Sequence, residues 1–545
     1  MLSRKRSVSP QAEKAKPEHD AIYLHGLPLW LLFTALCLVS ILVALYMTVI
    51  STATPLITTH FGTIEDVDWY STAYLLTICS LQPLTGHIFN LFRAKATFIS
   101  FLFIFAIGNL IGALAKSSHM FIVGRAIAGI GAAGMFNGSM VIFTAAASPS
   151  RRPQLFSVSF AMVGIGSVIG PVIGGAVTEH LGWRWCLWIF LPPIGAVIFI
   201  FLLLPIPEHT PKAPALATVR QLHHKLDGAG FALFSGACIM LLFAFSWGGS
   251  RFAWESATII GLLVGAPLTI ALLGAWLYYR KDRGLIPLTL LAKPIMYYGC
   301  ILSFLQGASF LQVAYYLPLW FQSVKGASPQ KGGIMLLPTC VAQIVASVSL
   351  VKKIPYAPVW AMLGNISTAV GSGLLTTLSA SSSSGHWIGY QILGGAGRGI
   401  SLQMPIIAIQ GTLSPKEIPI ATANLFFFQY FAGAVVNCIA KTIFVNALGP
   451  ALQEYAPNVD AQAVIHSGAT EILRIADAAD RAGVIEAYNK ALTLTFWLPC
   501  AAAIMGTFFC LGLGWHKVSA TKDAKKDEAV ENRSLDGETE GDRER

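Results

Sequence analysis

The sequence predicts an all-α, polytopic membrane protein, because both its composition and its hydropathy pattern exclude a soluble globule. Of the 545 residues, 54% are apolar and only 12% are charged, about half of the roughly 25% charged fraction of a soluble domain. Long windows without Asp, Glu, Lys or Arg alternate with short charged loops, which is the pattern of membrane-spanning helices. We therefore expect the net charge of +10 to reflect membrane topology and not binding to nucleic acid.

About fourteen apolar windows are long enough to cross a lipid bilayer, since a spanning helix needs about 20 apolar residues. With the N-terminus in the cytoplasm, the inner loops carry most of the Lys and Arg residues that lie between the windows. This positive-inside bias and the even number of windows place both termini in the cytoplasm. The predicted spans are residues 27–50, 69–90, 97–115, 121–147, 155–177, 186–204, 228–247, 257–279, 295–320, 333–350, 359–378, 387–409, 421–445 and 491–513.

Two polar stretches stand out between the spans. Residues 205–227 are rich in proline and then basic, and they follow the sixth span on the predicted cytoplasmic side. Residues 448–490 form a long outer loop, in which apolar residues between 472 and 485 recur at helical spacing among charges. That spacing predicts an amphipathic helix on the outer surface.

The fifth span carries the most specific local pattern of the chain. Gly166, Gly170 and Gly174 recur every four residues and form a smooth stripe along which another helix can approach closely. Pro171 is expected to kink this helix, and Gly175 extends the run of small residues. Ordinary helix packing would explain the stripe alone, but the full pattern GxxxGPxxGG is much narrower.

This pattern resembles the antiporter motif of the major facilitator superfamily. More narrowly, it resembles the fourteen-span drug:proton antiporter group, which is rich in fungal efflux pumps for toxins and secondary metabolites. The resemblance implies alternating access and a fold of two six-helix bundles around a central cavity, with two extra helices between them. The stretches that carry it are GSVIGPVIGG at 166–175, HLGWRWCLWIFLP at 180–192, and further similar segments at 67–86, 124–138, 391–410 and 483–492.

The resemblance also implies how the chain is divided. The seventh and eighth spans are the extra pair, and the polar stretch before them is the central linker. The predicted parts are a cytoplasmic tail (1–26), an N-terminal six-helix bundle (27–205), a cytoplasmic linker (206–227), two extra helices with a cytoplasmic loop (228–294), a C-terminal six-helix bundle (295–513) with the outer loop 448–490, and a disordered cytoplasmic tail (514–545).

Two motifs of the group are altered in this chain. The acid that is usual in the first span is replaced by Tyr46. The inner loop after the second span keeps Gly86 but has Asn90 where an acid would stand, while Arg93 and Lys95 preserve the basic residues. Both departures remove a carboxylate.

Charged residues inside the spans are few, and intramembrane ionisable groups mark function by default. No Asp or Glu lies near the middle of a predicted span. Arg125, with Gly129 and Gly131, matches the group's fourth-span motif, and the resemblance implies a role in cavity charge and proton coupling; an arginine paired to backbone carbonyls is the alternative. Arg398 lies near the middle of the twelfth span among glycines and either faces the cavity or packs inside the bundle. Any proton coupling must therefore run without a buried carboxylate.

Uncharged polar residues inside the spans are the candidates for a substrate cavity. Amides and aromatic rings without paired carboxylates suit a large amphipathic organic ligand better than an inorganic ion. With Arg398 near the midplane, we expect neutral or weakly acidic solutes to be preferred over cationic drugs. Each candidate could instead hydrogen-bond to a neighbouring helix. The candidates are Tyr46, Asn137, Gln306, Gln312, Gln403, Asn424 and Gln429.

Enzyme signatures are missing from the sequence. It contains no Walker A loop, HExxH, GxSxG or zinc-spaced Cys/His cluster, so we expect neither an enzyme nor a cofactor or metal site. The predicted function is proton-coupled export of a secondary metabolite, toxin or drug by a monomer in the fungal plasma membrane. A vacuolar or uptake carrier for siderophores or amino acids, and a receptor that binds without transporting, are the alternatives.

Overall fold

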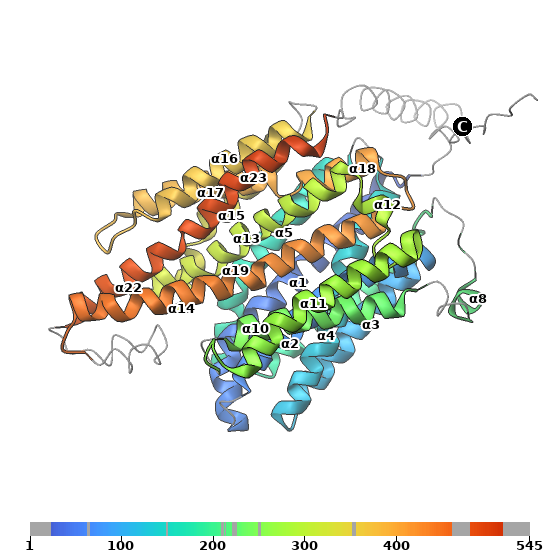
Figure 1. Cartoon of the computed structure of the whole chain (residues 1–545). Coiled ribbons are helices and arrows are strands. Elements are labelled where there is room, and N and C mark those ends of the chain that lie inside the picture. The colour runs from blue at the N-terminus through green and yellow to red at the C-terminus, as the bar shows by residue number, and fades with distance from the viewer. Residues whose placement is uncertain are drawn as a thin grey trace, which may run out of the picture.

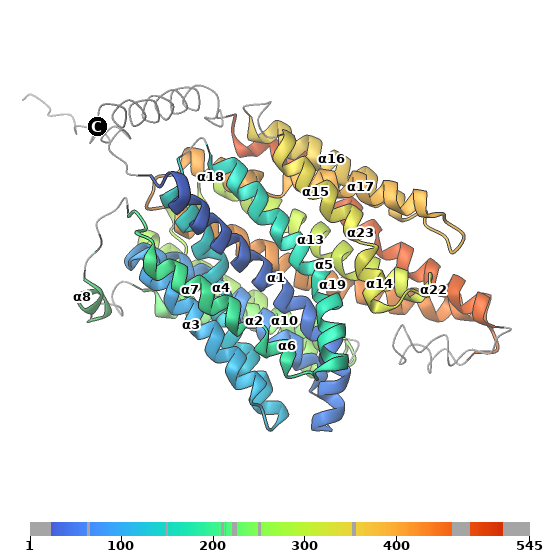
Figure 2. The same ribbon diagram turned by 180° about the vertical axis from the view of Figure 1, so that it is seen from behind.

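The structure, a computed structural model, is a bundle of long helices (Figures 1 and 2). It describes residues 23–62, 66–148, 151–208, 212, 214–220, 226–248, 252–350, 356–459 and 480–515. Within these ranges there is no β-strand, and 11 helices are long and apolar enough to cross a membrane. The predicted class of all-α polytopic membrane protein is therefore confirmed. Nearly all of both predicted tails and most of the segment predicted as an amphipathic helix lie outside the described residues.

The first set of helices, which we call the N-terminal group, is built around α4 and α1. α4 packs against α2 and α3, and α1 packs against α5. Glycine permits these close contacts, since a Cβ at Gly131 would lie 2.6 Å from the side chain of Phe105 on α3. The group comprises α1 (Gly26–Phe61), α2 (Val67–Leu91), α3 (Ala94–Ala113), α4 (Ser118–Ala146), α5 (Arg152–His180), α6 (Trp185–Trp188) and α7 (Leu191–Leu203).

The stripe of glycines on α5 is the surface that receives α1. A Cβ at Gly166 would lie only 2.6 Å from the carbonyl oxygen of Ile41, and one at Gly170 would collide with Oγ1 of Thr48. A Cβ at Gly175, by contrast, would meet no atom within 4 Å. α5 remains one continuous α-helix through Pro171. The two backbones therefore approach along one face only, as small-xxx-small packing requires.

A second set, the C-terminal group, follows the linker and the extra helices. Its main contacts are α13 with α19 and α23, α16 with α17 and α23, and α15 with α17. The group comprises α13 (Pro294–Ser323), α14 (Pro329–Ile334), α15 (Leu337–Leu350), α16 (Ala357–Leu375), α17 (Ser384–Ser401), α18 (Met404–Thr412), α19 (Ile418–Tyr455), α22 (Arg481–Thr495) and α23 (Trp497–Phe509).

The extra helices α10 (Gly228–Trp247) and α11 (Ala257–Arg280) lie at the edge of the bundle (Figure 1). α10 contacts both α2 and α19, so it covers the seam between the two groups. Asp227 fixes the start of α10, because its carboxylate accepts hydrogen bonds from Gly230 N, Trp276 Nε1 and Leu285 N at 2.9–3.0 Å. α11 exposes apolar side chains such as Leu268 (63% exposed), which suits a surface that faces lipid.

Several helix boundaries differ from the hydropathy windows. α1 continues to Phe61 and α19 to Tyr455, because polar residues that end an apolar window do not end a helix. Part of the predicted outer loop 448–490 is thus helical, in the last turns of α19 and the first turns of α22. The predicted spans 333–350 and 387–409 are each broken into two helices, between α14 and α15 and between α17 and α18.

The two groups meet at one end of the bundle, which we call the Gly86 end. A Cβ at Gly86 on α2 would lie 2.7 Å from Cα of Ile420 on α19. In the same region Gln410 Nε2 of α18 donates a 3.0 Å hydrogen bond to Thr144 Oγ1 of α4. The groups also meet where α5 packs against α14 and α15, whereas α17 and α22 lie far from α2 and α4 in both views (Figures 1 and 2). The Gly86 end is closed in this conformation.

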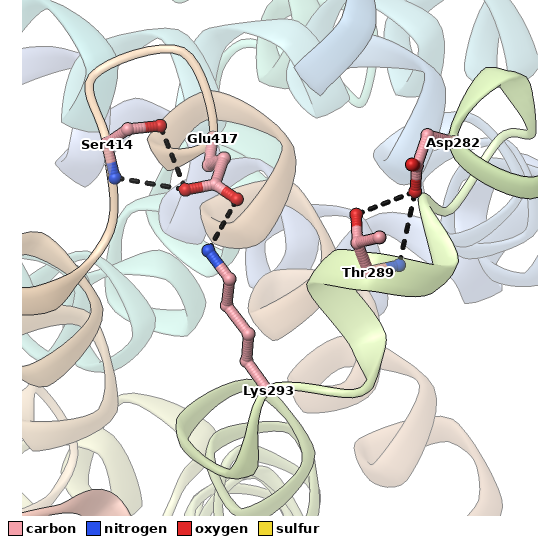
Figure 3. A network of polar contacts seen from close by, with 5 residues as sticks. All are labelled: Asp282, Thr289, Lys293, Ser414 and Glu417. Atoms are coloured by element: carbon pink, nitrogen blue, oxygen red, sulfur yellow. Dashed lines mark hydrogen bonds and ion pairs between the residues drawn. The ribbon is translucent and has the colours of Figure 1, made fainter. Parts of the chain in front are cut away.

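An ion pair ties the starts of α13 and α19 together (Figure 3). Lys293 Nζ lies 2.6 Å from Glu417 Oε1, and Ser414 donates to the other carboxylate oxygen from both its backbone N and its Oγ. Burial by itself would raise the pKa of Glu417, but the hydrogen bonds from Lys293 and Ser414 outweigh it and hold the pKa below its ordinary value. The carboxylate form of Glu417 therefore stabilises this junction.

We predict that Gly166→Ala lowers the stability of the folded protein, because the added methyl group meets a backbone carbonyl of α1 that cannot move aside. The expected loss is about 1–3 kcal/mol, the usual cost of overpacking, read as a lower melting temperature of the purified protein. Gly175→Ala is the matched control, since that position is open. Equal melting temperatures for the two variants would show that the stripe is not a packing surface.

A second prediction concerns how the free energy of unfolding changes as the pH is lowered. The lowered pKa of Glu417 contributes stability that is present above the ordinary value of 4.5 and is lost as the pH falls through the lower folded value. Glu417→Gln should reduce the free energy of unfolding at neutral pH by less than about 1 kcal/mol, as expected for a partly exposed pair. The difference from the unchanged protein should vanish in acid, whereas Glu255→Gln, at an exposed position, should show no difference at either pH.

Candidate functional site

Two adjoining cavities lie between the N-terminal and C-terminal groups. The first, which we call the apolar cavity, holds about 480 Å³ of empty space, part of it open to the surroundings, and is lined mainly by aromatic and aliphatic side chains from α1, α4, α5, α13 and α19. The second, the Arg398 cavity, has about 360 Å³ of empty space, part of it also open to the surroundings, and is lined from α5, α13, α15 and α17. Ser167 and Phe310 line both. The two cavities are therefore adjacent.

Arg398 is positioned by the glycines around it on α17. A Cβ at Gly395 would meet the carbonyl of Thr339, and one at Gly399 would meet the carbonyl of Gln343, both on α15. On the opposite face, Gly397 lies against α16 at Thr368. α17 is thus packed closely between the backbones of α15 and α16. The side chain of Arg398 lines the cavity beside it.

The polar atoms of the Arg398 cavity are incompletely satisfied. Arg398 is 3% exposed and Gln343 is 1% exposed. Arg398 Nη1 and both side-chain amide atoms of Gln343 have no hydrogen-bond partner among the described residues. No Asp or Glu lines this cavity or the apolar one. The site therefore offers buried donors and a positive charge without a protein counter-charge.

The chain breaks directly after Arg398. α17 ends at Ser401 and α18 begins at Met404, near the middle of the span Ser384–Thr412. Gln306 Nε2 of α13 donates a 2.8 Å hydrogen bond to Ser401 O and so satisfies a carbonyl freed at the break. Irregular backbone at this depth is tolerated only inside protein or along a cavity. Interrupted helices of this kind accompany binding sites in secondary transporters.

Arg125 forms a separate cluster inside the N-terminal group. Its guanidinium carbon lies 4.5 Å from the ring centre of Tyr46 and 4.7 Å from that of Tyr74, within the range of cation–π attraction. Nε donates to Tyr70 O at 2.7 Å. Nη1 has no conventional hydrogen-bond partner among the described residues, and neither does the hydroxyl of Tyr74. The tyrosine at the place of the usual acid thus contacts the arginine with its ring.

The glycines of the fourth-span motif allow this cluster to form. A Cβ at Gly129 would collide with Thr77 on α2, so glycine lets α4 press against α2 close to Tyr74. Gly131 faces α3 instead. The motif therefore sets the position of α4 between two neighbouring helices.

The inner-loop motif is held by the linker. Glu208 Oε1 accepts a 2.6 Å hydrogen bond from Ala94 N at the start of α3, and Lys212 Nζ donates to Phe89 O and Phe92 O at the end of α2. Burial lowers the pKa of Lys212, and Glu208 beside it opposes that shift. These contacts place opposite charges at two helix ends, where the helix dipoles favour them.

The motif's own basic residues behave differently. Lys95 donates to the carbonyls of Leu202 and Leu204 at the end of α7, whereas Arg93 is exposed and Asn90 is half-buried. The turn is therefore bound to the rest of the chain through Lys95 of the motif and through Glu208 and Lys212 from outside it.

The other predicted cavity residues divide into three sets. Gln429 lines the apolar cavity. Asn137 donates to Thr85, Gln312 donates to Thr495, and Asn424 donates to the carbonyl of Ile420 on its own helix. Gln403 is buried, and both of its amide atoms lack partners among the described residues, but it does not line either cavity.

Sequence reasoning missed the residue that faces Arg398. Gln343 lies in the window 333–350, which the hydropathy pattern marks only as a span. Its proximity to Arg398 follows from the packing of α15 on α17. A polar residue in an otherwise apolar window was the one signal that could have singled it out.

Comparison with known proteins agrees with this arrangement. Residues 36–437 match the Major Facilitator Superfamily. The chain is 40% identical over 512 residues to the MFS-type transporter pigP of Monascus ruber, which covers 93% of this chain and 90% of that protein. It is 36% identical over 536 residues to the efflux pump mlcE of Penicillium citrinum, with 95% and 97% covered.

A solved structure shares the fold. A double-tryptophan mutant of XylE superposes with a TM-score of 0.56 at 15% sequence identity, over 89% of this chain and 96% of that one. The helical architecture, the cavity between two helix groups and the sequence matches agree with one another. The chain therefore belongs to the Major Facilitator Superfamily and is a membrane transporter, not an enzyme.

Proposed function

We propose that this transporter exports small organic molecules of the secondary-metabolite or drug type by alternating access, coupled to proton antiport. The observation that carries the proposal is the pair of adjoining cavities between the two helix groups, lined by both groups at the depth of the helix break. Such a site can be exposed to either side by movement of one group against the other. The relatives named efflux pumps support the direction of transport.

The same proposal covers location and topology. The excess of basic residues in one set of loops supports a cytoplasmic position for both termini. We propose the plasma membrane of a fungal cell as the site of export and a monomer as the working unit, since both helix groups that line the cavities belong to one chain.

Alternating access requires the contact at the Gly86 end to separate. That contact consists of the packing of α2 and α4 against α19, with close backbone approach at Gly86, and includes the hydrogen bond from Gln410 to Thr144. No salt bridge joins the two groups there among the described residues. The interface can therefore open without separating an ion pair.

Proton coupling without a carboxylate in the middle of a span needs another polar relay. Every Asp or Glu of the described residues lies within two helical turns of a helix end or outside the helices. The hydroxyls of Tyr46 and Tyr74, whose rings lie beside Arg125, can each donate and accept a hydrogen bond. We assign the proton path to this cluster.

Tyr46→Phe tests the function and the relay together, because it keeps the ring over Arg125 and removes the hydroxyl. In proteoliposomes, the unchanged protein should exchange a naphthyl probe in counterflow and should accumulate it when a pH gradient is imposed. The variant should retain counterflow and should lose gradient-driven transport by at least about tenfold, since a proton-transfer group is missing. The probes are 1-naphthylacetate, 1-naphthylacetamide and (1-naphthylmethyl)trimethylammonium.

Fluxes in protein-free liposomes are subtracted, because a weak acid redistributes across a pH gradient without a carrier. Tyr316→Phe, at a buried tyrosine of the C-terminal group, serves as the matched control. Absence of counterflow with every probe would contradict transport and favour a receptor. Counterflow that does not respond to the gradient in the unchanged protein would contradict proton coupling.

The alternating-access part of the proposal predicts that locking the Gly86 end stops transport. Thr144→Cys combined with Gln410→Cys places two thiols at positions whose side chains are hydrogen-bonded in this conformation. A short bifunctional methanethiosulfonate reagent should abolish counterflow in the double variant, and a reducing agent should restore it. Each single variant controls for labelling alone, and undiminished counterflow after complete cross-linking would overturn the mechanism.

A further inference from the structure

The Arg398 cavity differs from the surroundings of the other buried charges. Among the described residues, the charged side chains classed as buried are Arg125, Asp227 and Arg398. Asp227 accepts three hydrogen bonds, and Arg125 lies between two aromatic rings and donates to a carbonyl. Arg398 has a cavity beside it that contains no carboxylate. A buried cation without a counter-charge is costly, so this position favours a ligand that supplies one.

Gln343 adds a second unsatisfied polar side chain to the same cavity. Both of its amide atoms are buried and lack partners among the described residues, although a buried unsatisfied amide group normally costs free energy. The close approach of Gly399 to the carbonyl of Gln343 holds the two side chains at the same level of α15 and α17. One guanidinium and one carboxamide thus provide N–H donors to the same space.

The other polar side chains that line the Arg398 cavity are already hydrogen-bonded elsewhere. Cys340 Sγ donates to Gly164 O, and Thr339 Oγ1 donates to Gln391 Oε1. Neither group supplies an acceptor that would neutralise Arg398. The adjoining apolar cavity, with Phe136, Phe160 and Tyr430 among its walls, shares the lining residues Ser167 and Phe310 with this site.

We propose that Arg398 and Gln343 bind the carboxylate of the transported molecule, and that the apolar cavity holds the apolar body of the same molecule. The substrate class is then an amphipathic organic monocarboxylate. This inference rests on the proposed export function and specifies its substrate. Arginine suits the role because its planar guanidinium binds both oxygens of a carboxylate. A cationic solute would be repelled at the same position.

Binding of the three naphthyl probes to the purified full-length protein tests the inference, because they share one apolar body and differ in charge. At neutral pH, 1-naphthylacetate should bind at least about tenfold more tightly than the carboxamide or the quaternary ammonium probe, as expected for a charge-assisted hydrogen bond. Arg398→Gln should weaken binding of the carboxylate on the order of tenfold to a hundredfold and should leave binding of the carboxamide unchanged. Arg398→Lys should keep part of the preference, since the charge remains.

Gln343→Met should weaken binding of the carboxylate several-fold, whereas Gln403→Met, at a buried glutamine outside both cavities, should not. Melting temperatures of all variants separate loss of binding from loss of folding. Equal affinity for the three probes, no saturable binding of 1-naphthylacetate, or a preference that survives Arg398→Gln would each overturn the inference. If counterflow persists, these outcomes contradict only the carboxylate site and not the proposed export function. Selective binding of the carboxylate without counterflow would instead contradict export and support the binding site.

Discussion

Burying a charge away from water costs several kcal/mol unless other groups replace its hydration, and the arrangement of this chain follows from that cost. The described acidic residues lie near helix ends or outside the helices, where water or backbone N–H groups can reach them. Lysines near the Gly86 end donate to free carbonyls at the ends of α2 and α7. The long helices are left almost entirely apolar, so van der Waals packing and close backbone approach must hold them together.

The two deep arginines meet this cost in different ways. Arg125 is surrounded by protein, with aromatic rings on two sides and a backbone carbonyl at Nε. Arg398 sits at the boundary of a cavity, beside a helix break and an unsatisfied amide. Arg125 is therefore suited to a permanent role within one helix group, and Arg398 is suited to a partner that enters and leaves. In the proposed mechanism, this division gives the proton path and the substrate separate places in the structure.

Much of the fold could be predicted from the sequence, because a lipid environment demands apolar helices of a minimum length. The windows that contain α3, α10 and α11 match those helices to within a few residues. The glycine stripe at Gly166 and Gly170 likewise predicts close packing, although the sequence does not show that α1 is the partner helix. The helix breaks at Met335–Leu336 and at Leu402–Gln403 could not be predicted, since hydropathy averages over a window and is insensitive to the hydrogen bonding of single carbonyls.

The candidate site shows where sequence reasoning stops. The sequence shows which residues inside the spans are polar, but not what they contact. Asn137 and Gln312 donate hydrogen bonds to neighbouring helices, whereas Gln429 lines a cavity. Which of these occurs depends on the rotation of each helix about its axis, and that rotation is set by contacts between distant segments. The sequence by itself determined the membrane class, the helical content and the exclusion of acids from the middle of the spans, because these follow from the cost of transferring residues into lipid. The tertiary structure alone decided that Arg125 contacts tyrosine rings and that Arg398 and Gln343 share a cavity, because only packing brings α1 to α4 and α15 to α17.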